Sequence, residues 1–446
     1  MNNTETEITD LKSKLISEFQ NFENSLNGEA ETTLHFIRKD ALEKFIELGF
    51  PMKKLEDWKY TNLNPALKQN FVQSFSEYSS TLKKEDIEKY FIKDSGINIL
   101  VFVNGHYDNE LSHIETKNEN AFIGSFSEGM NYHREIIEKH FAKIAAYDKN
   151  GFAAVNTAFA KDGCFIYVKK NYEVKEPVHI LNISDARNES YFSQLRKLVV
   201  VEEGGSINIA SDYHTIGDEK CFTNAVTEIY CGMNSKVEHY KIQNGSENSY
   251  HVGTTQVHQE KDSRFSDTTI SWGGSITRND LNSVFDGTNT ECHFYGLYLL
   301  TGKQHVDNHT LADHKMPHCY SNELYKGIID DNATGVFNGK IMVREDAQKT
   351  NAYQSNNNIL LSDDATIYSK PQLEIFADDV KCSHGATTGQ LNEDEMFYLQ
   401  ARGIGKENAR TLLLYAFASV VIDSINIEEL REMVVKKLEM KLNKEV

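Results

Sequence analysis

A short phrase recurs at nearly regular intervals in the middle of this 446-residue chain. Each copy has Gly, Asn or Asp, then Ser, Thr or Ala, then a β-prone run, and the first four copies begin 27 to 29 residues apart. A fixed period in this range is typical of repeat architectures, in which stacked units share one core because no single unit buries its own apolar face. The copies begin at Gly205-Ser206, Asn234-Ser235, Asp262-Ser263, Asn289-Thr290, Asn332-Ala333 and Asp364-Ala365.

The period favours a parallel β-helix or solenoid over the stretch from about residue 160 to residue 390. An irregular all-β sandwich is the alternative, but a sandwich has turn signals about every 8–12 residues and no such period. The fold class that we predict is therefore mainly β, with a β-helix core.

Helical periodicity is concentrated towards the two ends of the chain. Apolar residues recur at helical spacing over residues 8–26, with Asn27-Gly28 as a stop, and again over residues 37–46 before Gly49. A short helix is expected at 86–92, a buried strand at 97–103 and one more helix at 134–146, followed by a long stretch without helical periodicity.

The helical period returns after residue 391. One broad apolar face is expected in the first long helix there, and the last helix repeats apolar residues up to Leu442, with lysines near its end. We predict three parts: an N-terminal helical segment (1–95), a β-helix core (96–390) and a C-terminal helical segment (391–446). Helices at both ends would cap the open edges of a solenoid. The residues of the broad apolar face are Ala409, Leu412, Leu413, Ala416, Phe417, Val420 and Val421.

Charge and composition limit the function classes. The chain carries 47 basic and 66 acidic residues, a net charge of −19, which argues against nucleic acid or an anionic membrane as its main partner. Apolar residues make up 39%, enough for a substantial core. The longest apolar run, residues 412–422, is about half a membrane span.

The cysteines indicate a reducing compartment. None of the six belongs to a C-x-x-C pair, and the acidic, polar N-terminus resembles neither a secretory signal nor a transit peptide. We expect reduced thiols and a cytoplasmic location. The cysteines are Cys164, Cys221, Cys231, Cys292, Cys319 and Cys382.

Motifs for nucleotide hydrolysis and common hydrolases are missing from the sequence. The nearest match to a phosphate-binding loop, residues 296–303, has one residue too many and is followed by Gln304 in place of a hydroxyl residue. The sequence also contains no H-E-x-x-H and no G-x-S-x-G. We therefore expect this chain not to hydrolyse ATP.

The densest group of possible metal ligands lies between His305 and Cys319. If the segment begins as a strand, His305, Asp307 and His309 share one face because side chains alternate. Imidazole, carboxylate and thiolate suit iron or zinc, but interior polar ladders of a solenoid use the same residue types without metal. A hydrogen-bonded structural role is the favoured interpretation.

A second candidate is the pair Cys382 and His384, which lie two residues apart and would face the same way on a strand. A neutral imidazole there can ligate iron or assist a thiol. Taken alone, the pair is also explained by a buried thiol and a hydrogen-bonded histidine.

A third candidate is the turn Arg402-Gly403-Ile404-Gly405-Lys406 between two helices. It looks like a helix–hairpin–helix turn whose amides hold nucleic-acid phosphates, although an ordinary αα-hairpin with glycines at the helix end explains it as well. The acidic composition favours the ordinary hairpin.

Several segments together resemble the SufD family of iron–sulfur cluster assembly subunits. The strongest match runs through Asp378-Asp379-Val380-Lys381-Cys382-Ser383-His384-Gly385-Ala386-Thr387, and Cys-Ser-His-Gly-Ala-Thr is the SufD form, as opposed to that of the related SufB. The matching segments span nearly the whole chain in order: 49–51, 56–63, 305–310, 335–340, 358–362, 371–387 and 397–404.

The resemblance implies a right-handed parallel β-helix with flanking helices that pairs with SufB and docks the SufC ATPase through its C-terminal helices. It implies a scaffold subunit that is not an enzyme and that binds no nucleotide itself. It implies that a nascent iron–sulfur cluster, or iron, is held transiently at the SufB–SufD interface. By this resemblance His384 is the expected iron or cluster ligand and Cys382 a second, weaker one. A homodimer in the absence of SufB is also expected to be possible.

Two other function classes remain open from the residues alone. A β-helix carbohydrate-active enzyme would need a stacked column of carboxylates on a solvent-facing ladder, which the repeats lack. A nucleic-acid-binding module would use the Gly403-Ile404-Gly405 turn and would bind duplex DNA in a salt-dependent way.

Overall fold

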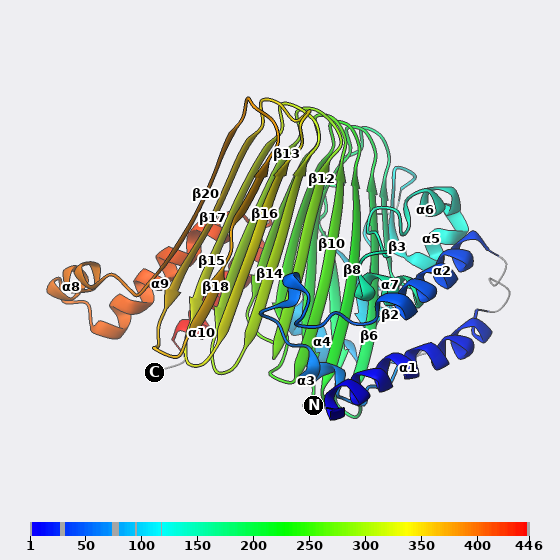
Figure 1. Cartoon of the computed structure of the whole chain (residues 1–446), viewed down its shortest axis with the longest axis horizontal. Coiled ribbons are helices and arrows are strands. Elements are labelled where there is room, and N and C mark those ends of the chain that lie inside the picture. Colours follow the sequence, from blue (N-terminus) through cyan, green and yellow to red (C-terminus); the bar gives the residue numbers. More distant parts are fainter. Residues whose placement is uncertain (1, 27–31, 74–79, 94–95, 117, 444–446) are drawn as a thin grey trace.

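The computed structural model describes residues 2–26, 32–73, 80–93, 96–116 and 118–443. The expected stop at Asn27-Gly28 lies outside the described residues. The chain forms a parallel β-solenoid of about eight turns, with helices before and after it (Figure 1). The predicted fold class is confirmed.

Two ten-stranded sheets make the two faces of the solenoid. The neighbouring strands are parallel, except for the antiparallel pairs β1–β2 and β3–β4 at the N-terminal end. The first sheet has the order β2 (His106–His113), β1 (Asn98–Val103), β5 (Val178–Asp185), β7 (Ser206–Ile216), β9 (Lys236–Asn244), β11 (Arg264–Ser271), β13 (Glu291–Leu300), β15 (Tyr320–Ile329), β17 (Asn351–Leu360), β20 (Lys381–Gly389).

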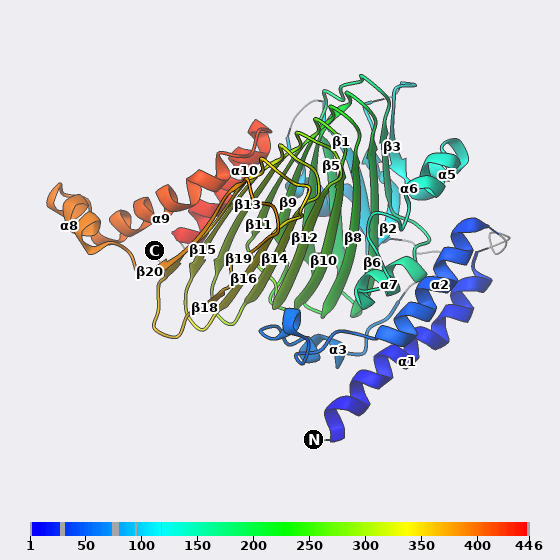
Figure 2. The ribbon, with the colours of Figure 1, turned by 45° about the horizontal axis from the view of Figure 1, so that its top comes forward.

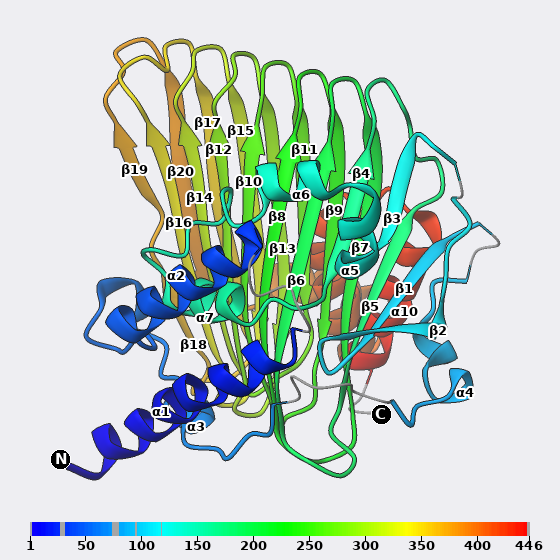
Figure 3. The ribbon, with the colours of Figure 1, turned by 90° about the vertical axis from the view of Figure 1, so that its right-hand side faces the viewer.

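The second sheet faces the first across the core (Figure 3). A short additional strand, β19 (Gln372–Ile375), also pairs with β16. The order is β18 (Thr366–Ser369), β16 (Thr334–Val343), β14 (His305–His314), β12 (Ile276–Phe285), β10 (Ser249–Gln259), β8 (Cys221–Cys231), β6 (Tyr191–Val201), β4 (Cys164–Val168), β3 (Ala121–Ser125).

The repeated phrase of the sequence marks one corner of successive turns. Asn234, Asp262 and Asn289 have φ near +60°, a left-handed conformation that Asn, Asp and Gly tolerate best. The backbone N–H of each donates to a carbonyl of the next coil: Asn234 to Lys261, Asp262 to Thr288 and Asn289 to Pro317. The period therefore reflects a stack of hydrogen-bonded corner residues.

Inward-facing side chains of both sheets form the main core. In β15, for example, buried and partly exposed positions alternate along most of the strand, as expected for a strand with one face towards a core. The core contains Val199, Ile229, Val257, Phe294 and Phe337. The six cysteines form no disulfide, five are buried, and Cys382 is half-buried.

The N-terminal helices pack on the outside of the second sheet (Figure 3). They are α1 (Asn2–Asn24), α2 (Thr33–Leu48), η2 (Glu56–Trp58) and α3 (Asn64–Leu67). Thr32 caps α2 by accepting from the N–H of His35, and Gly49 ends it with φ of 64°. Their apolar side chains meet Phe192, Phe222 and Tyr250 of the sheet.

The region between residues 80 and 160 contains more elements than the sequence indicated. The expected helix at 86–92 is α4 (Lys84–Ile87) followed by η3 (Glu88–Tyr90). Strands β2 and β3 and helices α5 (Phe126–Tyr132) and α7 (Gly151–Ala158) were not predicted. All eight residues of α7 are buried, so its sequence has no polar face to reveal a helical period.

The helix expected at 134–146 is shorter than predicted, because α6 spans only Arg134–His140. Ala142 has φ of 58°, and the backbone N–H groups of Ala142, Ile144 and Ala145 donate to the buried Glu228 carboxylate. That carboxylate also pairs with Arg196. The helix ends here because the backbone after it turns to donate these hydrogen bonds to the buried Glu228 carboxylate.

Up to residue 443, the last that the structure describes, three helices follow the solenoid: α8 (Glu393–Ala401), α9 (Lys406–Ile422) and α10 (Glu428–Leu442). Helices α9 and α10 pack on the outer face of the first sheet against Ile242 and Trp272, whereas α8 extends away from the solenoid (Figures 1 and 2). Within the described ranges, no helix is both long enough and apolar enough to cross a membrane.

The predicted apolar face of α9 was partly wrong. Leu412 and Val420 are about half exposed, at 49% and 50%, whereas Leu414 and Ala418 are buried. Because apolar residues surround this helix, periodicity alone did not identify the buried side.

Candidate functional site

The last strand of the first sheet, β20, pairs with β17 on one side only among the described strands. Most of its side chains are exposed. The N–H of Lys381 donates to Thr350, and because N–H directions alternate along a parallel strand, those of Cys382, His384 and Ala386 face the open side. The solenoid thus ends in a strand edge with unused backbone hydrogen-bonding groups.

Cys382 and His384 lie on the same face of β20, as their spacing predicted, and the register places that face inward. In register, Cys382 stands beside Ala352 and His384 beside Gln354, and both neighbours are buried. The Cys382 side chain packs against the main core, and burial raises the pKa of its thiol. The His384 side chain is exposed because no further coil covers it.

A polar column lies beneath His384 in the same register. Gln354 of β17 follows His384, and Glu323 of β15 follows Gln354. The Glu323 carboxylate accepts hydrogen bonds from Thr310 (2.6 Å) and Gln354 (3.1 Å), and burial raises its pKa to about 7. The column was not predicted, although the alternation of inward residues in the two strands was the signal that could have identified it.

Among the described residues, no third potential metal ligand joins His384 and Cys382. No group of three or more His, Cys, Asp or Glu side chains in the described residues could hold a metal ion. Iron usually needs more protein ligands than two.

The segment from His305 to Cys319 has a structural role. His305, Asp307 and His309 share one face of β14, as predicted, and Thr61 of the N-terminal segment bonds His305 (2.8 Å) and donates to Asp307 (2.5 Å). His309 lies 3.0 Å from the other Asp307 oxygen. The group is thus occupied by hydrogen bonds and ion pairs.

The rest of that segment points elsewhere. His314 is buried beside Ser321 at 2.9 Å, and burial lowers its pKa to about 3, which keeps the imidazole neutral. Cys319 is buried and donates to the carbonyl of Gly287. The His, Asp and Cys side chains of residues 305–319 therefore do not meet at one common site.

The N-terminal signature around Trp58 attaches to the same face. The Arg278 guanidinium lies 4.4 Å from the Trp58 ring, pairs with Asp280 and Asp307, and donates to the Asp57 carbonyl. Burial alone would raise the pKa of Asp307, but Arg278, His309 and Thr61 together hold that pKa below its usual range. The signature therefore fixes the N-terminal segment to the second sheet.

The Arg402–Lys406 turn is an ordinary helix end. Gly403 has φ of 87°, and the N–H groups of Gly403 and Ile404 donate to Gln400 and Leu399 of α8. This is the glycine-terminated pattern expected at a helix C-terminus. The nearby helices expose large apolar side chains: Phe397 (73%), Tyr398 (56%), Leu412 and Val420.

Family models match most of the chain. Residues 182–417 match the SUF system FeS cluster assembly SufBD core domain, and residues 9–180 match the SufBD protein N-terminal region.

Similar proteins carry related names. An iron–sulfur cluster assembly SufBD family protein of Synechocystis is 34% identical over 415 residues, 91% of this chain and 90% of that protein. SufD of Escherichia coli is 28% identical over 90% of this chain and 91% of its own length. SufD of Bacillus subtilis is 27% identical, with 91% and 93% covered. This chain therefore belongs to the SufBD family of iron–sulfur cluster assembly proteins.

Proposed function

We propose that this chain is a SufD-type scaffold subunit. It pairs with a SufB-like protein through the open edge of β20 and docks a SufC-like ATPase through its C-terminal helices. It contributes His384, and more weakly Cys382, to the place where a nascent iron–sulfur cluster forms. The iron and sulfide are cargo that the complex holds transiently.

The observation that carries this proposal is an exposed histidine on an unpaired strand edge. Edge strands are normally protected, because their free N–H and C=O groups pair readily with another strand. A partner strand would gain these hydrogen bonds and would bring its own side chains beside His384. The incomplete ligand set of this chain is what a site shared between two subunits requires.

The C-terminal helices provide a separate surface for the ATPase. Helix α8 has no buried residue, and its Phe397 and Tyr398 are exposed together with Leu412 and Val420 of α9. Large apolar and aromatic side chains of this kind are enriched at protein interfaces. Since this sequence has no phosphate-binding loop, nucleotide hydrolysis belongs to the partner.

The proposed mechanism is a nucleotide-driven opening. Two ATPase subunits dimerise on ATP and pull on the C-terminal helices of this chain and of its SufB-like partner. The paired strand edges then separate enough to expose His384 to incoming iron and sulfide. The open and closed pairings are the two states that nucleotide biases, as a coupling between distant sites requires.

We extend the proposal to organisation and location. The three-part division at residues 95 and 390 separates the solenoid from the helical segments at its ends. The reduced cysteines and acidic charge suit the cytoplasm. When the SufB-like partner is absent, a second copy of this chain is the alternative occupant of the β20 edge.

The proposal is tested by co-purifying the chain with its SufB-like and SufC-like partners, followed by anaerobic iron and sulfide reconstitution. We expect a ternary complex with a cluster absorption band. His384→Ala should lose most of that band and keep the complex, because the side chain is exposed and supports no packing. Ser383→Ala, on the opposite face of the same strand, is the matched control and should keep the band.

Two results would contradict parts of the proposal. A normal band from His384→Ala would assign the cluster ligands to the partner alone. Retained ATPase binding after removal of the residues that follow Asn392 would exclude docking through the C-terminal helices.

A further inference from the structure

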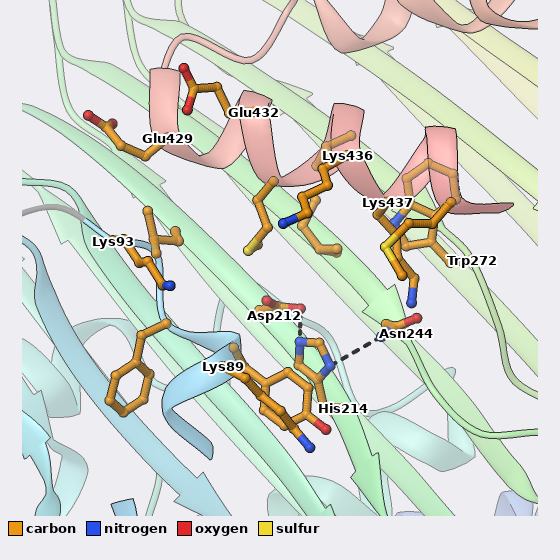
Figure 4. Close-up of a pocket in the computed structure, with 17 residues that line it drawn as sticks. Lys89, Lys93, Asp212, His214, Asn244, Trp272, Glu429, Glu432, Lys436 and Lys437 are labelled. Atoms are coloured by element: carbon orange, nitrogen blue, oxygen red, sulfur yellow. Dashed lines mark hydrogen bonds and ion pairs between the residues drawn. The ribbon is translucent and has the colours of Figure 1, made fainter. Parts of the chain in front are cut away.

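The two long C-terminal helices lie over different parts of the first sheet. Helix α10 lies beside Trp272, and a cavity of about 490 Å³ lies between part of this helix and residues 89–93 (Figure 4). Helix α9 instead contacts β13 and β15, and in the order of the sheet only β17 lies between β15 and the edge strand β20. Of the two helices, α9 is therefore the one closer along the sheet to the candidate site.

Apolar packing holds α9 against the sheet. Leu414, Ala418 and Val421 are buried in α9, and they belong to one apolar cluster with Leu299 and Ile328 of the sheet. Apolar attraction has no preferred direction, and packed helices can slide past one another in small steps. These contacts keep the helix on the sheet but do not by themselves fix its position along β15.

Two polar contacts fix that position. The Lys326 ammonium of β15 donates to the carbonyl of Phe417 in α9 at 2.9 Å and lies 4.4 Å from the centre of the Phe417 ring. Burial lowers the pKa of Lys326, as expected for an amino group that is partly removed from water. Directly after β15, the Asp330 carboxylate accepts from Arg410 of α9 at 3.2 Å. Because hydrogen bonds need a defined distance and angle, the two contacts set the register of α9 on β15.

Strand β15 is connected through one further strand to the open edge. Lys326 stands in register with Asn357 of β17, and Asn357 with Thr387 of β20. The Thr387 hydroxyl also donates to the Asn357 amide oxygen at 2.8 Å. Two strand spacings, about 10 Å, separate Lys326 from β20. Because closely packed interiors transmit strain, a displacement of β15 reaches the strand that carries His384.

We propose that Lys326 and Asp330 are positioning residues that couple α9 to the β20 edge. This role depends on the proposed function, in which the SufC-like ATPase displaces the C-terminal helices. The two contacts carry the displacement of α9 into β15, and β20 then moves away from its partner strand beside His384. Without these contacts α9 slides over the sheet, so ATP hydrolysis continues while the edge stays closed.

The coupling is tested in the complex of the full-length chain with its SufB-like and SufC-like partners. Hydrogen exchange of the β20 amides is measured by mass spectrometry without nucleotide and with ATP, and ATP should speed this exchange in the wild type. Lys326→Met/Asp330→Asn should form the same complex and hydrolyse ATP at the same rate. Its ATP-dependent gain in β20 exchange should be at least about fivefold smaller.

Further variants separate coupling from a general loss of charge or packing. Lys170→Met/Glu203→Gln makes the same kinds of substitution in a 2.6 Å ion pair outside α9 and β15, and should keep the full ATP response. Lys326→Arg retains a donor at this position and should keep most of the response. If the double variant does not fold, Asp330→Asn alone removes only the ion pair with α9 and should show a smaller loss of response.

Three results would overturn the coupling role. A full ATP response in Lys326→Met/Asp330→Asn would exclude it and leave the proposed function intact. No ATP response in the wild-type complex would exclude the nucleotide-driven opening, and the coupling role with it. Loss of ATP hydrolysis together with the response would assign the two residues to docking of the ATPase instead of coupling.

Discussion

The two ends of the solenoid are built differently. At the N-terminal end, β2 and β3 turn antiparallel to the stack, and the edge strand β2 carries Asp108 and Glu110 beside an irregular register with β1. Helices α5 and α6 cover the outer face of β4 and β6 nearby. At the C-terminal end, Lys381 is the one charged residue of the nine in β20.

The N-terminal end of the solenoid is protected against pairing with another strand, whereas the C-terminal end is available for it. Charges, register irregularities and covering helices are the usual devices that prevent edge-to-edge association, and the N-terminal end has all three. Apart from Lys381 and His384, strand β20 has small, uncharged residues, and its open-side amides have no strand partner among the described residues. Substitutions where helices or the N-terminal segment cover the sheets should therefore reduce the free energy of unfolding. Substitutions in β20 should instead weaken binding of the SufB-like partner and leave the isolated chain folded.

The largest expected effect is on the side that the N-terminal segment covers. Arg278→Met leaves the buried Asp307 without its cation and removes the contact with Trp58. We expect a loss of about 3–5 kcal/mol in the free energy of unfolding, measured by urea denaturation. Arg264→Met, which removes an exposed pair with Glu291, should cost less than about 1 kcal/mol. Similar losses for the two variants would contradict this assignment.

A somewhat smaller effect is the pH dependence of stability that Glu323 causes. Glu323 belongs to the polar column below His384. Because burial raises the pKa of Glu323 from 4.5 to about 7, folding favours its protonated form. The protonated Glu323 carboxyl therefore adds to the free energy of unfolding. This addition is complete below pH 4.5 and is lost as the pH rises through 7, which lowers the free energy of unfolding by roughly 3 kcal/mol. Glu323→Gln should lack it, as denaturation at several pH values would show. An unchanged pH dependence would mean that Glu323 is charged in the folded chain.

The smallest expected change is in the free energy of binding the SufB-like partner, and it should occur without a change in the stability of the isolated chain. Ala386→Pro removes an N–H that faces the open edge, so the isolated chain should keep its Tm, while binding of the SufB-like partner weakens at least about tenfold. Ala386→Ser keeps the N–H and is the control. If proline leaves partner affinity unchanged, β20 does not add a strand.

Much of the fold could be predicted from the sequence, because the repeat and the helices at both ends leave recognisable patterns of residues. The corner residues Asn234, Asp262 and Asn289 need a left-handed backbone that few residue types tolerate, so the period is visible in the sequence. The alternation that places Cys382 and His384 on one face is equally local.

Other features depend on contacts that no local pattern contains. Helix α6 ends early because Glu228, far along the chain, accepts three of the following N–H groups. The role of the His305 group depends on Thr61, which packs on it from the N-terminal segment. The polar column below His384 likewise arises only from the stacking of distant coils.

Hydrogen exchange at the two edges tests the central claim most directly. Amides of β20 and β2 are compared by mass spectrometry in the free chain and in its complex with the SufB-like partner. The account predicts that the open-side amides of Cys382, His384 and Ala386 exchange fast in the monomeric free chain and become strongly protected in the complex, whereas exchange in β2 does not change. Exchange in β20 that stays the same after the complex forms would contradict it.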